Sequence, residues 1–188
     1  MGNIVPAAQL SSSAGMKILA AMAWAAVLGL GVVRAASGAE PTERAVERAQ
    51  ALVDRMKAFD AEGVMDLTYT RVFERLGVAP ERARRGMREL QQKLKSLDAR
   101  YTRLELGQPH APFAGDGNLY VIIPYSGVME LQGKRILQEA FFIGVSEDAG
   151  KAWKFVDGIN STQESIRTVI PSYSGAPLPP RRTKPIGF

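Results

Sequence analysis

Residues 119–145 read LYVIIPYSGVMELQGKRILQEAFFIGV, and this stretch decides the fold. Gln132-Gly133 separates two apolar runs and favours a tight hairpin turn between them. The runs Leu119–Ile123 and Ala140–Ile143 are apolar at consecutive positions, so both faces of each strand carry apolar side chains. We therefore expect paired antiparallel strands at the centre of a sheet that is covered on both sides or curled around a cavity. Pro124 cannot donate to a strand ladder and predicts a bulge or bend.

The chain on either side of this hairpin predicts two further strands. Thr102, Leu104 and Leu106 alternate with polar residues, which is the period of a half-buried strand. After the hairpin, a turn leads into the segment 152–156. Four strands joined by short turns indicate an antiparallel meander.

Helices are predicted before and after these strands. The first, 41–59, has Thr42 in position to cap it and the sequence 60–63 to stop it. A short helix is expected over 66–76 and a longer one over 80–97, and Ser161 with Glu164 forms a capping box for a last helix through Val169. The expected buried side of the first helix is Val46, Ala49, Val53 and Met56, and that of 80–97 is Ala83, Met87, Leu90, Leu94 and Leu97.

Gly86 lies inside the longer helix and weakens it by about 1 kcal/mol relative to alanine. A glycine at such a position predicts a close contact with another helix. Together the elements predict an α+β fold in which N-terminal helices pack on a curved, antiparallel four-stranded sheet, within one domain over 40–171.

Both ends of the chain are predicted to lie outside this domain. Lys17 precedes the apolar run 18–33, and small residues follow at Ser37-Gly38-Ala39, the pattern of a cleaved signal peptide over 1–39. Met16 is an alternative start. The run is shorter than the roughly 20 residues that a membrane-spanning helix needs, so we expect no stable membrane anchor and an exported protein, periplasmic or secreted, with a retained N-terminal anchor as the alternative. The proline-rich basic segment 172–188 is expected to lie on the domain or to remain free.

Composition excludes several kinds of site. There is no cysteine and the single histidine is His110, which rules out disulfides and zinc sites built from thiolates or several imidazoles. A carboxylate-only calcium or magnesium site is left open, although no EF-hand-type loop occurs. The net charge of +5 falls to +3 without Lys17 and Arg34, too small for a nucleic-acid footprint. We expect no metal, no cofactor and no nucleic-acid partner.

The sequence 146–153, SEDAGKAW, matches the S-x-D-x-G-x-x-W pattern of the Asp-box of sialidase-like propellers. Propellers repeat this motif in each blade, whereas here it occurs once in a chain too short for a ring of blades. A glycosidase is therefore excluded. We interpret the motif as a structural turn formed by Ser146, Asp148, Gly150 and Trp153.

The segments 120–125 (YVIIPY) and 142–158 (FIGVSEDAGKAWKFVDG), with Ile170-Pro171 and Leu178-Pro179, resemble small exported bacterial proteins of uncharacterised function. These belong to the nuclear transport factor 2-like, or cone-fold, superfamily. The earlier segment 63–69 resembles the part that follows their first helix. The resemblance implies a cavity between a curved sheet and the helices. It also implies either a non-catalytic binding domain or an enzyme such as an isomerase, hydrolase or cyclase.

Such enzymes place a carboxylate opposite a tyrosine, and this chain offers several residues of those types. The candidate catalytic residues are Glu139, Asp66, Tyr69 and Tyr125, and the candidate ligand-binding residues are Tyr101, Phe141 and Ile143. Glu139 alternates in phase with Phe141 and Ile143 and is a candidate carboxylate on an apolar face. Alternatively, it pairs with Arg135 or Arg103 on a solvated face, which the rarity of unpaired buried charges favours.

We expect a non-catalytic exported domain that binds a small apolar ligand or a partner protein through its cavity or sheet face. The alternative is a cofactor-free isomerase, hydrolase or cyclase that uses a cavity carboxylate and a tyrosine. An exposed apolar sheet face would also predict a homodimer through the sheet.

Overall fold

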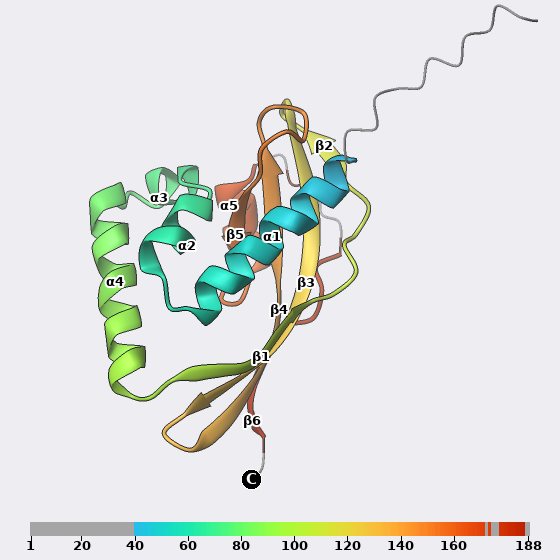
Figure 1. The fold of residues 1–188 in the computed structure, drawn as a ribbon. Helices are drawn as coiled ribbons and strands as arrows, with labels where there is room; N and C mark the ends of the chain where they lie inside the picture. The colour runs from blue at the N-terminus through green and yellow to red at the C-terminus, as the bar shows by residue number, and fades with distance from the viewer. Residues whose placement is uncertain (1–39, 172, 174–176, 187–188) are drawn as a thin grey trace, which may run out of the picture. The chain divides into compact units, whose positions relative to one another are not determined.

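A computed structural model describes residues 40–171, 173 and 177–186, which belong to one compact unit, Gly38–Phe188. The expected leader over 1–39 lies outside the described residues. The elements follow one another as α1 (Pro41–Lys57), α2 (Ala61–Leu67), α3 (Arg71–Arg75), α4 (Pro80–Ser96), β1 (Arg100–Leu106), β2 (Phe113–Gly115), β3 (Asn118–Leu131), β4 (Lys134–Ser146), β5 (Lys154–Asp157), α5 (Gln163–Val169) and β6 (Arg182–Ile186). The fold is α+β, as expected (Figure 1).

The β3–β4 hairpin is the longest paired unit of the sheet. Its pairing runs without a break from Leu119↔Ser146 to Leu131↔Lys134. The connecting residues, Gln132 and Gly133, both have positive φ, at 49° and 75°, as a two-residue type I′ turn requires. The predicted tight hairpin is confirmed.

The bulge predicted at Pro124 is wrong, because Pro124 pairs with Phe141 in continuous register. Its carbonyl accepts a hydrogen bond of 2.7 Å from the amide of Gly107, just beyond the end of β1. The imide nitrogen of Pro124 therefore faces an edge where the neighbouring strand has ended, and no ladder bond is lost. The register shift lies in β1 instead, between Tyr101 and Arg103.

The sheet has six antiparallel strands rather than the expected four. The four predicted strands form the path β1-β3-β4-β5, while β2 pairs with β3 and β6 pairs with β4. Strand β6 comes from the predicted tail and runs from Arg182↔Glu139 to Ile186↔Arg135. The described end of the tail thus lies on the domain as an edge strand.

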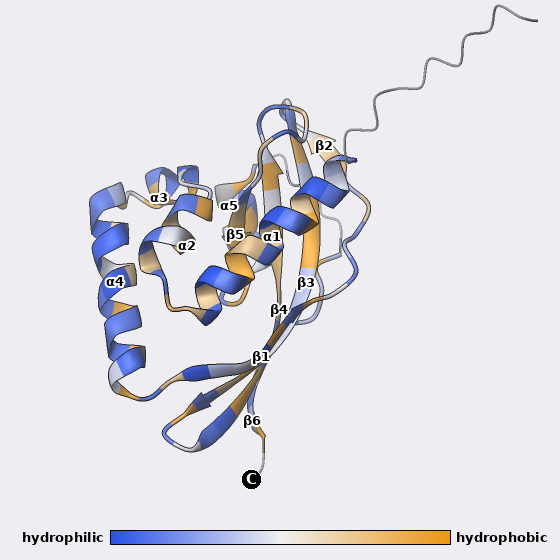
Figure 2. Cartoon of the chain, viewed as in Figure 1, coloured by the Kyte–Doolittle hydropathy of each residue, from blue (hydrophilic) through white to orange (hydrophobic). Residues whose placement is uncertain are grey.

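Apolar residues are buried on both faces of this sheet. On one face, α1 contributes Leu52 and Val53 and α2 contributes Leu67 to a cluster with Val121 and Phe142 of the hairpin. On the other face, Ile166 and Ile170 of the α5 segment, with Tyr69 and Tyr173, cover Ile122, Phe141 and Ile143. Figure 1 shows α1 lying across β3 and β4, and Figure 2 shows the hydrophobic residues concentrated along these two strands. The expected two-sided cover is present.

Three helix boundaries differ from the sequence expectation. Glu40, not Thr42, caps α1 in a reciprocal pair with Glu43. Helix α1 ends at Lys57, and Asp60 begins α2, because its carboxylate accepts a 3.0 Å hydrogen bond from the amide of Gly63. The single helix expected over 66–76 is therefore replaced by α2 and α3. The last helix is capped by Thr162 with Ser165 instead of Ser161 with Glu164.

The buried side expected for α4 is also wrong. Ala83, Met87, Leu94 and Leu97 are only half-buried, Leu90 is 52% exposed, and the one buried residue of the helix is Gln91. Met87 packs against the apolar cluster beneath α1, so the predicted stripe borders the packed side of the helix and Gln91 lies at its most buried point.

The predicted turn residues lie in a dense hydrogen-bond network at the β4–β5 connection. The Ser146 hydroxyl donates to Asp148 (2.8 Å) and accepts from the amide of Gly150 (2.7 Å). Asp148 also accepts from the amides of Lys151 and Ala152, and these bonds lower its pKa, that of Ala152 most strongly.

The same turn is joined to α1. The carbonyl of Gly150 accepts hydrogen bonds from the Trp153 indole (3.2 Å) and from Arg44 of α1 (2.9 Å). Gly150 has φ +84°, and an added Cβ would approach Pro41 to 2.6 Å. Only glycine fits there, and the turn fixes where α1 begins above the sheet.

Substitution of Ser146 by alanine should lower the free energy of unfolding by about 1–3 kcal/mol, because a buried amide loses its acceptor. Urea unfolding followed by circular dichroism measures this change. The matched control is Ser96→Ala at the exposed end of α4, where we expect at most about 0.5 kcal/mol. Equal losses in the two variants would contradict a structural role for this turn.

Candidate functional site

The structure brings a tyrosine and a carboxylate together on the face of the sheet that α1 and α2 cover. The Tyr125 hydroxyl of β3 donates a 3.0 Å hydrogen bond to Oδ1 of Asp157, the last residue of β5. The Tyr125 ring stacks on Phe142 of the intervening strand, with the ring centroids 4.4 Å apart. The residue directly opposite Tyr125 is the small Ala140, so the ring is free to lean across β4 toward β5.

The chain around Asp157 holds its carboxylate in place. Oδ1 also accepts a 3.0 Å hydrogen bond from the amide of Ile159, a local turn that aspartate commonly forms. Gly158 follows directly, and an added Cβ there would come within 2.3 Å of the Phe141 ring. Both described hydrogen bonds fall on Oδ1, so Oδ2 has no hydrogen-bond partner among the residues that the structure describes.

The electrostatics of Asp157 reflect a crowded position that solvent still reaches. Desolvation by the surrounding protein raises its pKa above the ordinary 3.8, although the bonds from Ile159 and Tyr125 oppose the rise. Asp157 is nevertheless exposed at its surface. Water that reaches the carboxylate screens part of this desolvation.

A second tyrosine lies beside this pair. Burial first, and the negative charge of Asp157 second, together raise the pKa of Tyr101 to about 12. Burial likewise raises the pKa of Tyr125, with Asp157 as the second cause. Both phenols are therefore protonated donors at neutral pH. The ring of Tyr101 stacks on Phe59, with the centroids 5.9 Å apart.

Phe59 also connects the tyrosines to a cleft. An open cleft of about 390 Å³ lies between the α1–α2 connection and α4, and its lining includes Phe59, Arg88, Gln91 and Lys95. Gln91 is 8% exposed, and its Oε1 is buried without a hydrogen-bond partner. Because an unpaired buried acceptor is costly, this oxygen marks a place where a donor fits.

The other candidate carboxylates do not lie next to a tyrosine in this way. Glu139 is half-buried, and its Oε2 lies 3.4 Å from Nε of Arg182 in β6. Glu139 is therefore paired with an arginine, but the partner is Arg182 and not Arg135 or Arg103. The side chain of Asp66 is 68% exposed and 3.6 Å from Arg84.

Tyr69, Phe141 and Ile143 lie in the apolar cluster on the opposite face of the sheet from Tyr125. The Tyr69 hydroxyl donates to Glu147 (3.2 Å), which also pairs with Arg71. Of the candidate residues, only Tyr125 and Tyr101 come together in the new site.

Asp157 was not among the candidates from the sequence. It follows Phe155 at a spacing of two in KFVDG, so it shares the helix-covered face with that buried aromatic residue. The sequence signal that could have identified Asp157 was a carboxylate at the same alternation as the apolar residues of a strand. The glycine after it favoured reading the aspartate as part of a turn.

Within the described ranges, no group of three or more His, Cys, Asp or Glu residues is arranged to hold a metal ion. Among the same residues, no helix has the length and apolar character that crossing a membrane requires. Comparison of the chain with protein-family models, with curated proteins and with solved structures found no match.

The raised pKa of Asp157 predicts a pH-dependent stability difference between the wild type and Asp157→Asn. A pKa raised by folding favours the folded state below the unfolded pKa of about 4, and this contribution disappears as pH rises through the folded value. The asparagine variant lacks it. Its unfolding free energy relative to the wild type should therefore increase over that pH window and stay level above it.

Urea unfolding at a series of pH values measures this difference. The control is Asp116→Asn, which removes a carboxylate from an exposed turn at the other end of the sheet. A relative stability of Asp157→Asn that decreases with rising pH would contradict a raised pKa.

Proposed function

We propose that the protein is an exported, cone-like binding domain that holds a small, largely apolar ligand on the helix-covered face of its sheet. The observation that carries the proposal is the free Oδ2 of Asp157, an acceptor fixed through Oδ1 and bordered by Tyr125, Phe142 and Tyr101. An aromatic surface with a small number of fixed polar groups is the usual composition of a small-molecule site.

The surrounding features support a ligand with hydrogen-bond donors. Oδ2 of Asp157 and Oε1 of Gln91 are both acceptors without a described partner. Phe59 lies between the cleft that contains Gln91 and the ring of Tyr101. The resemblance to nuclear transport factor 2-like proteins agrees with a site between helices and sheet, and the pattern over 17–39 supports export.

β-Naphthol is a suitable probe because it combines a flat apolar ring system with one hydroxyl donor. It should bind saturably to the protein in isothermal titration calorimetry. Asp157→Asn should weaken binding by about tenfold or more, since the bond from the naphthol hydroxyl to a charged acceptor becomes a bond to a neutral one.

Two controls distinguish this hydrogen bond from nonspecific hydrophobic binding of β-naphthol. The methyl ether of β-naphthol lacks the donor and should bind weakly to both the wild type and Asp157→Asn. Asp116→Asn should bind β-naphthol as the wild type does. If Asp157→Asn and the wild type bind β-naphthol equally, Asp157 is not the anchor and the proposal fails.

A second candidate function, proton abstraction, is favoured by the raised pKa of Asp157 and by the protonated Tyr101 close to it. A carboxylate with a raised pKa is a stronger base, and a tyrosine hydroxyl is a suitable donor to an enolate oxygen. In this function the Asp157 carboxylate takes a proton from the carbon next to a carbonyl, and Tyr101 donates to the carbonyl oxygen.

β-Tetralone tests this second function, because its α-protons exchange with deuterium in D₂O and nuclear magnetic resonance follows the exchange. An enzyme of this kind accelerates the exchange, and Asp157→Asn abolishes the acceleration. Binding of β-naphthol without any acceleration of exchange would leave the binding function alone.

A further inference from the structure

Helix α4 has an outer face that no residue described by the structure covers. Ala79, Gly86 and Leu90 are exposed and Ala83 is half-buried, and their spacings of four, three and four residues place them in one stripe. An added Cβ at Gly86 would meet no atom of the surrounding structure within 4 Å. The close helix contact that Gly86 predicts is therefore not made within the described chain.

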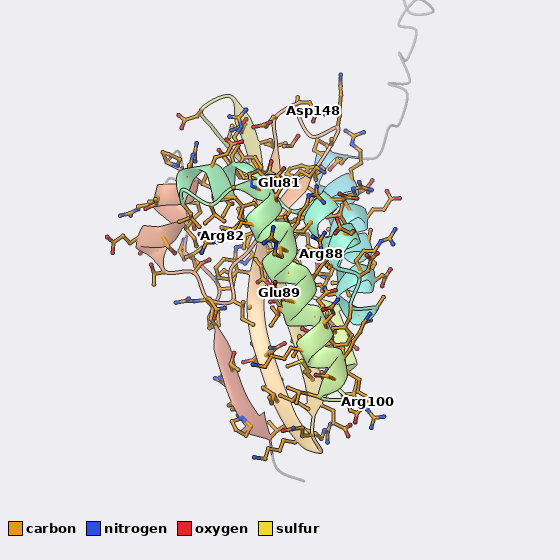
Figure 3. The ribbon with its side chains drawn as sticks, turned by 90° about the vertical axis from the view of Figure 1, so that its left-hand side faces the viewer. Glu81, Arg82, Arg88, Glu89, Arg100 and Asp148 are labelled. Atoms are coloured by element: carbon orange, nitrogen blue, oxygen red, sulfur yellow. The ribbon has the colours of Figure 1, made fainter. Side chains whose placement is uncertain are left out.

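Charged residues border this stripe, and some of them form no ion pair within the part of the chain that the structure describes. Arg84 and Arg88 form ion pairs with Glu62 of α2. Arg82 and Glu89, in contrast, are exposed and form no ion pair with any residue that the structure describes. Figure 3 looks onto α4 and shows Arg82 to the left of the helix, Arg88 to its right and Glu89 between them. Glu81 and Arg85 are likewise exposed and form no ion pair among the described residues, but their spacing places them further round the helix from the stripe. Arg82 and Glu89 therefore flank the stripe most closely, seven residues apart.

We propose that this face binds the same face of a second copy of the chain, with the two α4 helices antiparallel. In an antiparallel helix pair, a residue that flanks the apolar stripe on one side contacts residues that flank the partner's stripe on that same side. Arg82 then faces Glu89 of the partner subunit, and Glu89 faces Arg82 of the partner subunit. A two-fold axis relates these two contacts, so Arg82 and Glu89 of both copies form ion pairs.

The same alignment fits the sizes of the apolar residues. At its centre, Ala83 packs against Gly86 of the partner subunit, so the two backbones approach closely. Further out, Leu90 packs against Ala79 of the partner subunit, a large side chain against a small one. A hollow of about 510 Å³ already lies beside Ala79 and Gly86, and Arg82 and Glu89 are among the residues that border it. Charge and volume thus select the same register independently.

A second copy fits this face better than an unrelated partner because the pattern is complementary to itself. It also fits better than a dimer through the sheet, because apolar residues at the centre of the sheet are buried on both faces in the described part. The partner therefore needs no charge or shape that this chain does not carry.

Sedimentation equilibrium of the full chain and of the unit Gly38–Phe188 tests the proposal. Both should form a reversible dimer over micromolar to submillimolar concentrations. Glu89→Arg should weaken the dimer by about tenfold or more, because two arginine–arginine contacts replace two ion pairs. The charge exchange Arg82→Glu with Glu89→Arg should restore it. The control Glu47→Arg makes the same change of charge at an exposed position of α1, away from α4, and should leave the dimer intact.

Gly86→Leu separates dimer formation from folding. The space around Gly86 is open and leucine favours helix, so the variant monomer should melt at the same or a higher temperature. Its dimer should be lost because the central layer no longer closes. A monomeric wild type, a dimer insensitive to Glu89→Arg, or a dimer formed only by the full chain would overturn the proposal.

Discussion

The two-sided apolar character of the β3–β4 hairpin is the constraint on which the rest of the structure depends. A strand with one polar face can leave that face in water, but Val121 and Phe142 face one side while Ile122 and Phe141 face the other. Each side therefore needs its own cover, since leaving either in water forfeits the free energy of apolar burial. Helices α1 and α2 supply one layer. The α5 segment and Tyr173, which come after the sheet in the chain, supply the other.

The candidate site arises where the first of these layers meets polar groups of the sheet. Trp153 and Phe155 are fully covered, whereas Asp157, two residues further along β5, is exposed. The Ser146–Trp153 turn determines this arrangement from the other end of β5, because its bond to Arg44 fixes where α1 starts over the sheet. The motif that resembles an Asp-box thus carries no chemistry itself. It sets the position of the helix layer that leaves Asp157 reached by solvent.

Local sequence patterns predicted the central hairpin, the four-strand path and most helices because each depends on neighbours within a few residues. They could not predict the Tyr125–Asp157 pair, whose members are 32 residues apart and meet only through the register of three strands. Strand β6 was missed for a related reason. Its residues are mostly exposed and include Pro185, so its pairing with β4 follows from a neighbouring edge and not from its own composition.

The same limit explains α4 and connects the two proposals. Helical spacing identified its apolar stripe correctly, but spacing does not reveal whether the chain covers that stripe. The structure leaves Leu90 exposed but half-buries Met87 and Leu94, and Gln91 and Arg88 line the cleft beside Phe59. Because α4 packs only on α2 and α3 among the elements with substantial contacts, a helix bound on its outer face would restrict its movement. The dimer and the ligand would then act on one helix from opposite sides. By thermodynamic reciprocity, any effect of the dimer on ligand affinity is matched by an equal effect of the ligand on dimer affinity.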